Sequence, residues 1–210
     1  MARTRRNRLD WIILRGGLTV LVLGGALTIP LQLWGALRSD QLSWDGDVGY
    51  ATDLPGTLIT PAPGASFTFD GSVGVIVFDP STRLSLIAAA PGILLAAAIA
   101  YVAWVLLLIV LNVQSQDSFA GRVPQLLATL GPVIAFASVA ITLLNAYANR
   151  EIMLTALGQQ QVQFAIESSD LFTFEIVPMA AWLFVALFVS AVARAFAEGQ
   201  RLSHDIDGLV

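Results

Sequence analysis

The sequence offers few side chains whose type and spacing suit chemistry. The single histidine, His204, lies beside Asp205 and Asp207, and imidazole and carboxylate groups of this kind can bind Zn²⁺. These residues belong to a short polar tail, so we interpret them as solvated side chains and not as a metal site. Cysteine is absent, which excludes disulfide bonds, thiolate zinc sites and thiol nucleophiles.

The sequence motifs of common enzyme classes are missing as well. We find no Walker loop, GxSxG elbow, HExxH zinc motif or dinucleotide-binding fingerprint. No acid, base or nucleophile lies where a substrate could meet it. The sequence therefore predicts a protein that is not an enzyme and that uses no cofactor or metal.

The composition indicates where such a chain resides. Hydrophobic residues make up 56% of the 210 residues, against roughly 45–50% in ordinary globular chains. Charged residues make up 12%, about half the usual share, and the mean hydropathy is +0.75. These values exclude a disordered chain, a direct nucleic-acid-binding domain and a typical cytosolic enzyme. They predict an integral membrane protein.

Four apolar stretches account for this composition. Each holds the ~20 apolar residues that cross the hydrocarbon core of a bilayer, and none has an ionisable residue near its centre. They cover about 11–37, 84–113, 123–148 and 172–196. The first is longer than the roughly 7–15 residues of a signal-peptide core, so we expect it to remain as an anchor. We predict a mainly α integral membrane protein, a four-transmembrane-helix bundle that forms a single membrane domain over residues 1–210.

The arginines predict how this bundle is oriented. If both termini are cytoplasmic, eight of the eleven arginines lie inside and three lie outside, while ten of the fifteen acidic residues lie outside. This distribution follows the positive-inside rule. We therefore expect a multi-pass membrane protein with both termini in the cytoplasm. The inner arginines are Arg3, Arg5, Arg6, Arg8, Arg15, Arg122, Arg194 and Arg201, and the outer ones are Arg38, Arg83 and Arg150.

The long polar segment 38–83 predicts a small extracytoplasmic sheet between helices 1 and 2. Residues 66–69 alternate, Asp70 and Gly71 supply a turn, and the β-rich run 73–78 follows. Asp-Gly between two such runs is a strong hairpin signal, because glycine tolerates a positive φ. Residues 58–60 could add a third strand, and we expect the sheet to rest on the outer ends of the helices. An irregular loop is the alternative.

Small residues on the apolar stretches indicate where helices approach each other. Ala88, Gly92, Ala96 and Ala100 recur every four positions and share a helix face. The first stretch offers two glycine pairs, from which we assign Gly17 and Gly24 to helix packing. We expect contacts inside the bundle, and a seam between two copies is the alternative, so a homo-oligomer stays open. The few polar residues inside the stretches are Gln32, Ser85, Ser138, Thr142, Asn145 and Ser190.

The C-terminal part carries a family resemblance. An apolar helix ends in Phe196, followed by Gly199, Leu202, an acid and Asp207 before a final apolar pair. This pattern resembles the C-terminus of the DUF2975 family of small bacterial membrane proteins. The connection 117–122 resembles that family's Pro-Phe segment, with Ser118 where proline is usual. The resemblance implies four spans in the bacterial inner membrane and no catalytic residues. It also implies a signalling role, because genes of the family often lie beside a gene for a small helix-turn-helix regulator.

Two function hypotheses follow. The first is a non-enzymatic membrane sensor or regulatory partner that uses the outer sheet for input. Its output surface would be cytoplasmic, where a regulatory protein could bind and the N-terminal arginines would contact anionic lipid. The second is a small transporter or an accessory subunit of a transport complex, which the lack of ionisable residues near the centres of the spans disfavours. The candidate partner contacts are Phe119, Arg122, Arg201, Asp205 and Asp207.

Overall fold

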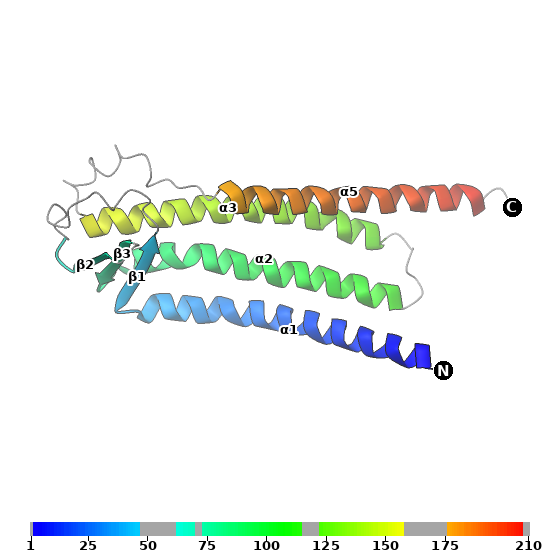
Figure 1. The fold of residues 1–210 in the computed structure, drawn as a ribbon, viewed down its shortest axis with the longest axis horizontal. Coiled ribbons are helices and arrows are strands. Elements are labelled where there is room, and N and C mark those ends of the chain that lie inside the picture. The colour runs from blue at the N-terminus through cyan, green and yellow to red at the C-terminus, as the bar shows by residue number, and fades with distance from the viewer. Residues whose placement is uncertain (1, 47–61, 70–72, 115–121, 158–175, 208–210) are drawn as a thin grey trace. The chain divides into compact units, whose positions relative to one another are not determined.

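The computed structural model describes residues 2–46, 62–69, 73–114, 122–157 and 176–207 (Figure 1). In these ranges the chain forms four long helices and one three-stranded sheet, which lies between the first two helices in the chain. This confirms the predicted fold class. The helices are α1 (Ala2–Arg38), α2 (Thr82–Gln114), α3 (Arg122–Leu157) and α5 (Ile176–Asp207), and the strands are β1 (Gln41–Gly46), β2 (Ala65–Phe69) and β3 (Val73–Phe78).

Each helix contains an apolar segment that is long enough to cross a membrane. The segments are Trp11–Arg38, Thr82–Asn112, Val123–Ala156 and Pro178–Gly199. The first three agree with the predicted stretches, but the helices extend further because polar helix-forming residues continue them. The fourth helix begins at Ile176 and continues to Asp207, past the predicted limit at 196, while residues 172–175 lie outside the described ranges.

Large apolar side chains cover the outside of these helices. Phe136, Phe184 and Leu187 are each at least 70% exposed. Of the 18 most apolar consecutive residues in each helix, 6% are buried in α1, 11% in α5 and 22% in both α2 and α3. Exposed apolar area on this scale is unfavourable in water, and a lipid environment removes that cost. At the end of α1 the guanidinium of Arg38 lies 4.0 Å from the ring centre of Trp34, a pairing suited to the membrane–water interface.

The contacts divide the chain into two compact units. The first unit is Met1–Ile29, Leu94–Val139 and Val177–Val210, and the second is Pro30–Ile93 and Ala140–Ile176. Helices α1, α2 and α3 are continuous through both units.

In the first unit, neighbouring helices meet through small and polar side chains. Helices α2 and α3 are joined where the Tyr101 hydroxyl donates to Thr129 Oγ1 over 3.3 Å. Helices α3 and α5 are joined where Ser138 Oγ donates to the Met179 carbonyl over 3.3 Å. Because lipid supplies no hydrophobic force between helices, such close contacts and hydrogen bonds hold them together. Between α1 and α2, Leu18 packs in an apolar cluster with Ala103, Leu107 and Val110.

The sheet belongs to the second unit and has the strand order β1-β3-β2, with both pairs antiparallel. The hairpin predicted from 66–69 and 73–78 is confirmed, with Phe69 opposite Val73. An irregular loop is therefore wrong for these residues. The turn residues Asp70 and Gly71 and the suggested strand 58–60 lie outside the described residues. The third strand that the structure shows is β1, which the sequence pattern did not predict.

Candidate functional site

The sheet is fixed to the helix ends by a buried apolar core. Side chains alternate along a strand, so Val75 and Val77 of the central strand β3 point to the same face, and they are 0% and 4% exposed. They pack against the start of α2 and the end of α3, and no member of this core is more than 6% exposed. The helix residues are Leu84, Ile152, Met153 and Ala156, with Leu42, Ala65 and Ala88 at the edge.

The chain passes directly from β3 into α2, and local hydrogen bonds define the junction. Asp79 has a φ of 50°, a left-handed conformation that aspartate tolerates better than most residues, and it ends the strand. Ser81 then caps α2, because its Oγ accepts a hydrogen bond from the Leu84 amide over 3.3 Å. This cap fixes the first turn of α2 and places Leu84 in the core beneath the sheet.

The approach to β2 is tied to both the sheet and α3. Gly64 has a φ of +86°, where a side chain would be strained, and its carbonyl accepts a hydrogen bond from the Phe78 amide over 2.7 Å. Two residues earlier, the Ala62 amide donates to the Ala156 carbonyl over 2.9 Å. Ala156 is among the last four residues of α3, whose carbonyls have no partner inside the helix. The backbone before β2 therefore completes the end of α3.

The opposite face of the sheet is the candidate interaction surface. It carries the row Ser43, Ile76 and Ser66, which lie opposite one another in the register, and the pair Gln41 and Phe78. Gln41, Ser43 and Phe78 are exposed. This surface presents hydroxyl groups, a carboxamide and an aromatic ring, a set suited to recognising another molecule by hydrogen bonds and apolar contact.

Acidic residues lie at the edge of this surface. The Asp79 amide donates to the Asp40 carbonyl over 2.9 Å, so the two residues are held next to each other, and both are exposed. In the described part of the chain, no three residues of the types His, Cys, Asp and Glu come together as a metal-binding group. The residues that the structure places here could contribute charge to the recognition of another molecule.

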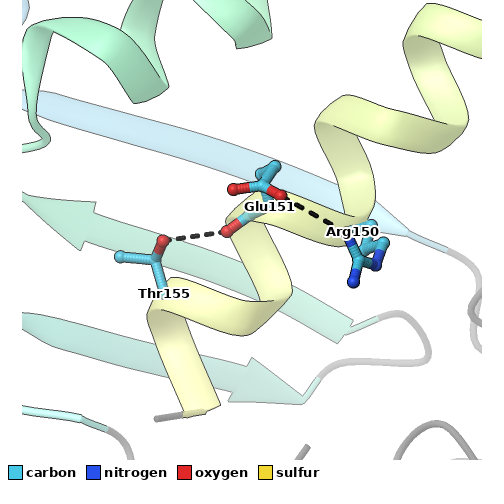
Figure 2. Close-up of polar contacts among 3 residues, drawn as sticks. All are labelled: Arg150, Glu151 and Thr155. Atoms are coloured by element: carbon cyan, nitrogen blue, oxygen red, sulfur yellow. Dashed lines mark hydrogen bonds and ion pairs between the residues drawn. The ribbon is translucent and has the colours of Figure 1, made fainter. Parts of the chain in front are cut away.

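The end of α3 beside the sheet carries an ion pair, which Figure 2 shows. Arg150 Nη1 lies 3.5 Å from Glu151 Oε1, and their side chains are 44% and 25% exposed. Thr155 Oγ1 donates to the Glu151 carbonyl over 2.8 Å. Exposed ion pairs typically contribute about 0–1 kcal/mol to stability. We therefore interpret this pair as part of the polar surface of α3.

The predicted packing residues divide into three groups. Ala96 and Ala100 meet α1 as expected, because a Cβ on Gly25 would lie 2.9 Å from both the Ala96 carbonyl oxygen and the Ala100 Cβ. Gly92 also meets α1, at Gln32. Ala88 instead packs at the edge of the core under the sheet.

The assignment of Gly17 and Gly24 to helix packing is corrected by the structure. Both are exposed, and a Cβ on either residue would meet no heavy atom within 4 Å. The reason is the rotation of α1, which turns Gly25 towards α2 and leaves Gly24 to the side. Sequence reasoning also missed Gln32 as the neighbour of Gly92. The available signal was a long polar side chain seven residues after Gly25, and therefore on the same helix face.

The candidate partner contacts are placed only in part. Phe119 lies outside the described residues. Arg122 is the first residue of α3, and Arg201, Asp205 and Asp207 lie in the last turns of α5, beyond the end of the apolar segment at Gly199. The backbone of α5 thus continues as a helix through the predicted tail contacts.

Comparison of the chain with protein-family models, with curated proteins and with solved structures found no match in any of the three. The resemblance to the DUF2975 family therefore stays a prediction.

Proposed function

We propose that this chain is a non-enzymatic membrane signalling protein that responds to binding at its extracytoplasmic sheet and acts on a cytoplasmic regulatory partner. The observation that supports this proposal most directly is the buried core between the sheet and the ends of α2 and α3, in which Val75 and Ala156 are 0% exposed. A force on the outer face of the sheet acts on these helix ends, because a close-packed core transmits displacement and does not absorb it.

Short connections reinforce this coupling. Only Ser39 and Asp40 separate the end of α1 from β1, and only residues 79–81 separate β3 from α2. Two neighbouring strands of the sheet are thus nearly continuous with two membrane helices. Binding at Ser43, Ile76 or Phe78 would displace strands that pull directly on α1 and α2.

The output side is proposed to be cytoplasmic. Helix α1 starts at Ala2, before its apolar segment, and α5 continues to Asp207, after its own. With four spans across the inner membrane, both extensions emerge on the same side. The first extension carries four arginines and one aspartate over residues 2–10, which suits anionic lipid. The second carries Arg201, Asp205 and Asp207, which suit a protein partner. A helix-turn-helix regulator is the partner that the DUF2975 resemblance implies.

Affinity purification from native membranes tests the proposal. The variant Arg201→Ala, Asp205→Ala, Asp207→Ala removes the charged groups of the tail, and Leu187→Ala is the control on the same helix at a 70% exposed apolar position. We expect one cytoplasmic protein to be retained by the wild type and the control and lost from the tail variant. Retention by all three proteins, or by none, contradicts the proposal. Solute uptake by proteoliposomes that contain the purified protein alone would favour the alternative, a small transporter.

A further inference from the structure

In the second unit, the side-chain carboxamide of Gln32 on α1 lies against Gly92 on α2. Gln32 Nε2 and Oε1 are each 2.9 Å from the position that a Cβ on Gly92 would take, and its Cδ is 3.2 Å from it. The flat amide therefore fills the space that the missing side chain of Gly92 leaves. Any larger residue at position 92 would expel it. The amide and the glycine thus fit closely in shape.

The oxygen of the Gln32 amide lacks a hydrogen-bond donor among the described residues. This Oε1 atom is buried, with less than 1 Å² of accessible surface. Polar side chains between membrane helices normally bond across the seam, and a buried acceptor without a donor is unfavourable. The closed seam excludes water from this oxygen, so a donor reaches it only when the amide or the helices around it move.

Each of the two helices contains a proline close to the Gln32 amide. Pro30 lies inside α1, two residues before Gln32, and Pro91 lies inside α2, directly before Gly92. A proline inside a helix removes one backbone hydrogen bond and favours a kink. Each helix can therefore bend at this level with less resistance than elsewhere.

We propose that the contact of Gln32 with Gly92 is a latch that is poised to open. In the open state, α1 bends away from α2 at the prolines. Water then enters the seam and donates a hydrogen bond to Gln32 Oε1. The unpaired acceptor favours opening, while the close packing against Gly92 favours closure. Such a balance makes the seam responsive to a small displacement of the adjoining strand β1. The latch can be tested without any partner, so its failure is distinguishable from failure of the proposed function.

Thiol reactivity measures the opening. The chain has no cysteine, so Ala36→Cys introduces a single thiol one turn after Gln32, on the same helix face, at a half-buried position. The rate of its reaction with N-ethylmaleimide is measured in nanodiscs. Gln32→Met keeps the length of the side chain and removes the unpaired acceptor, so we expect it to slow the reaction about tenfold. Gly92→Ala expels the amide, so we expect it to accelerate the reaction.

A purely structural role for Gln32 predicts the opposite order. If the glutamine held the helices together, Gln32→Met would accelerate the reaction, and that result or an unchanged rate overturns the latch. Ala103→Cys is the matched control, since Ala103 is buried beside Leu18 in the first unit, and Gln32→Met should leave its rate unchanged. If Gly92→Ala does not fold, as judged by its thermal midpoint, the comparison between wild type and Gln32→Met decides alone.

Discussion

The glycines of these helices differ in the space that a substituted side chain would have. A Cβ on Gly131 of α3 would collide with Ser190 Oγ and lie 2.9 Å from the Ala186 carbonyl oxygen, both on α5. Gly25 is enclosed to a similar degree by α2, whereas Gly24, its neighbour, meets nothing within 4 Å. In lipid, the close approach of backbones replaces the hydrophobic force between helices. Gly25 and Gly131 are therefore the positions where the α1–α2 and α3–α5 contacts are most sensitive.

The two adjacent glycines of α1 provide a matched test. We expect Gly25→Leu to lower the thermal midpoint in detergent, because overpacking of a close contact costs about 1–3 kcal/mol. Gly24→Leu should melt at the wild-type temperature or slightly above it, because leucine is the better helix former. Differential scanning fluorimetry of both variants measures the difference. Equal midpoints would mean that α1 and α2 do not meet at Gly25.

Only part of this contact could be predicted from the sequence. The small face of α2 was visible from its four-residue spacing, and Ala96 and Ala100 do meet α1. Which glycine of the pair they meet depends on the rotation of α1, since adjacent residues point about 100° apart. Leu18, Gly25 and Gln32 are spaced by seven and form the face that contacts α2. Because the three residues differ in type, no pattern of apolar or small residues marked this face in the sequence.

Among the elements, the helices were easier to predict than the sheet. Bilayer thickness sets the number of apolar residues in a span, so length alone reveals each membrane helix. The β2–β3 hairpin was visible because its strands are neighbours in the chain and alternate. Strand β1 was not, because it has few apolar residues and its partner β3 follows more than 25 residues later. Pairing over that distance leaves no local signal.

The central strand provides the test of the sheet. Val75→Ala removes buried methyl groups from the core beneath the sheet, and we expect a loss of about 1–3 kcal/mol. Ile76→Ala removes a larger side chain from the opposite, partly exposed face and should cost less. Hydrogen exchange of the β3 amides measures both effects, with faster exchange in Val75→Ala. Equal exchange in the two variants, or the reverse order, would contradict the assignment of the buried face.

At the scale of the whole molecule, the proposed orientation segregates charge by side of the membrane. Assigning both termini to the cytoplasm gives the inner segments eight basic and five acidic residues, a net charge of +3, and the outer segments three basic and ten acidic residues, a net charge of −7, which together give the −4 of the chain. The sheet and its acidic edge at Asp40 and Asp79 then lie on the negative side. If the sheet binds a ligand on that side, as proposed, this arrangement favours one that is neutral or cationic.

Cysteine labelling of intact cells tests this orientation. Ser43→Cys places a thiol on the exposed face of β1, and Gly199→Cys places one at the exposed end of the α5 apolar segment. An impermeant maleimide should label the first in intact cells and the second only after the cells are opened. The absence of native cysteine gives a clean background. Labelling in the reverse pattern would show that the termini are extracytoplasmic.

The strand order β1-β3-β2 has a consequence for biosynthesis. The central strand is the last of the three to leave the ribosome, so β1 and β2 have no partner until residues 73–78 have been synthesised. The core beneath the sheet is completed only when Ile152, Met153 and Ala156 have been synthesised, more than 70 residues after the end of β3. The apolar face of the sheet is uncovered while α2 and α3 are inserted. During this period, exposed apolar surface and unpaired strand edges are prone to aggregation. Completion of α3 is thus the step that ends this exposure. In the proposed orientation, chains truncated before residue 152 should depend on chaperones on the far side of the membrane.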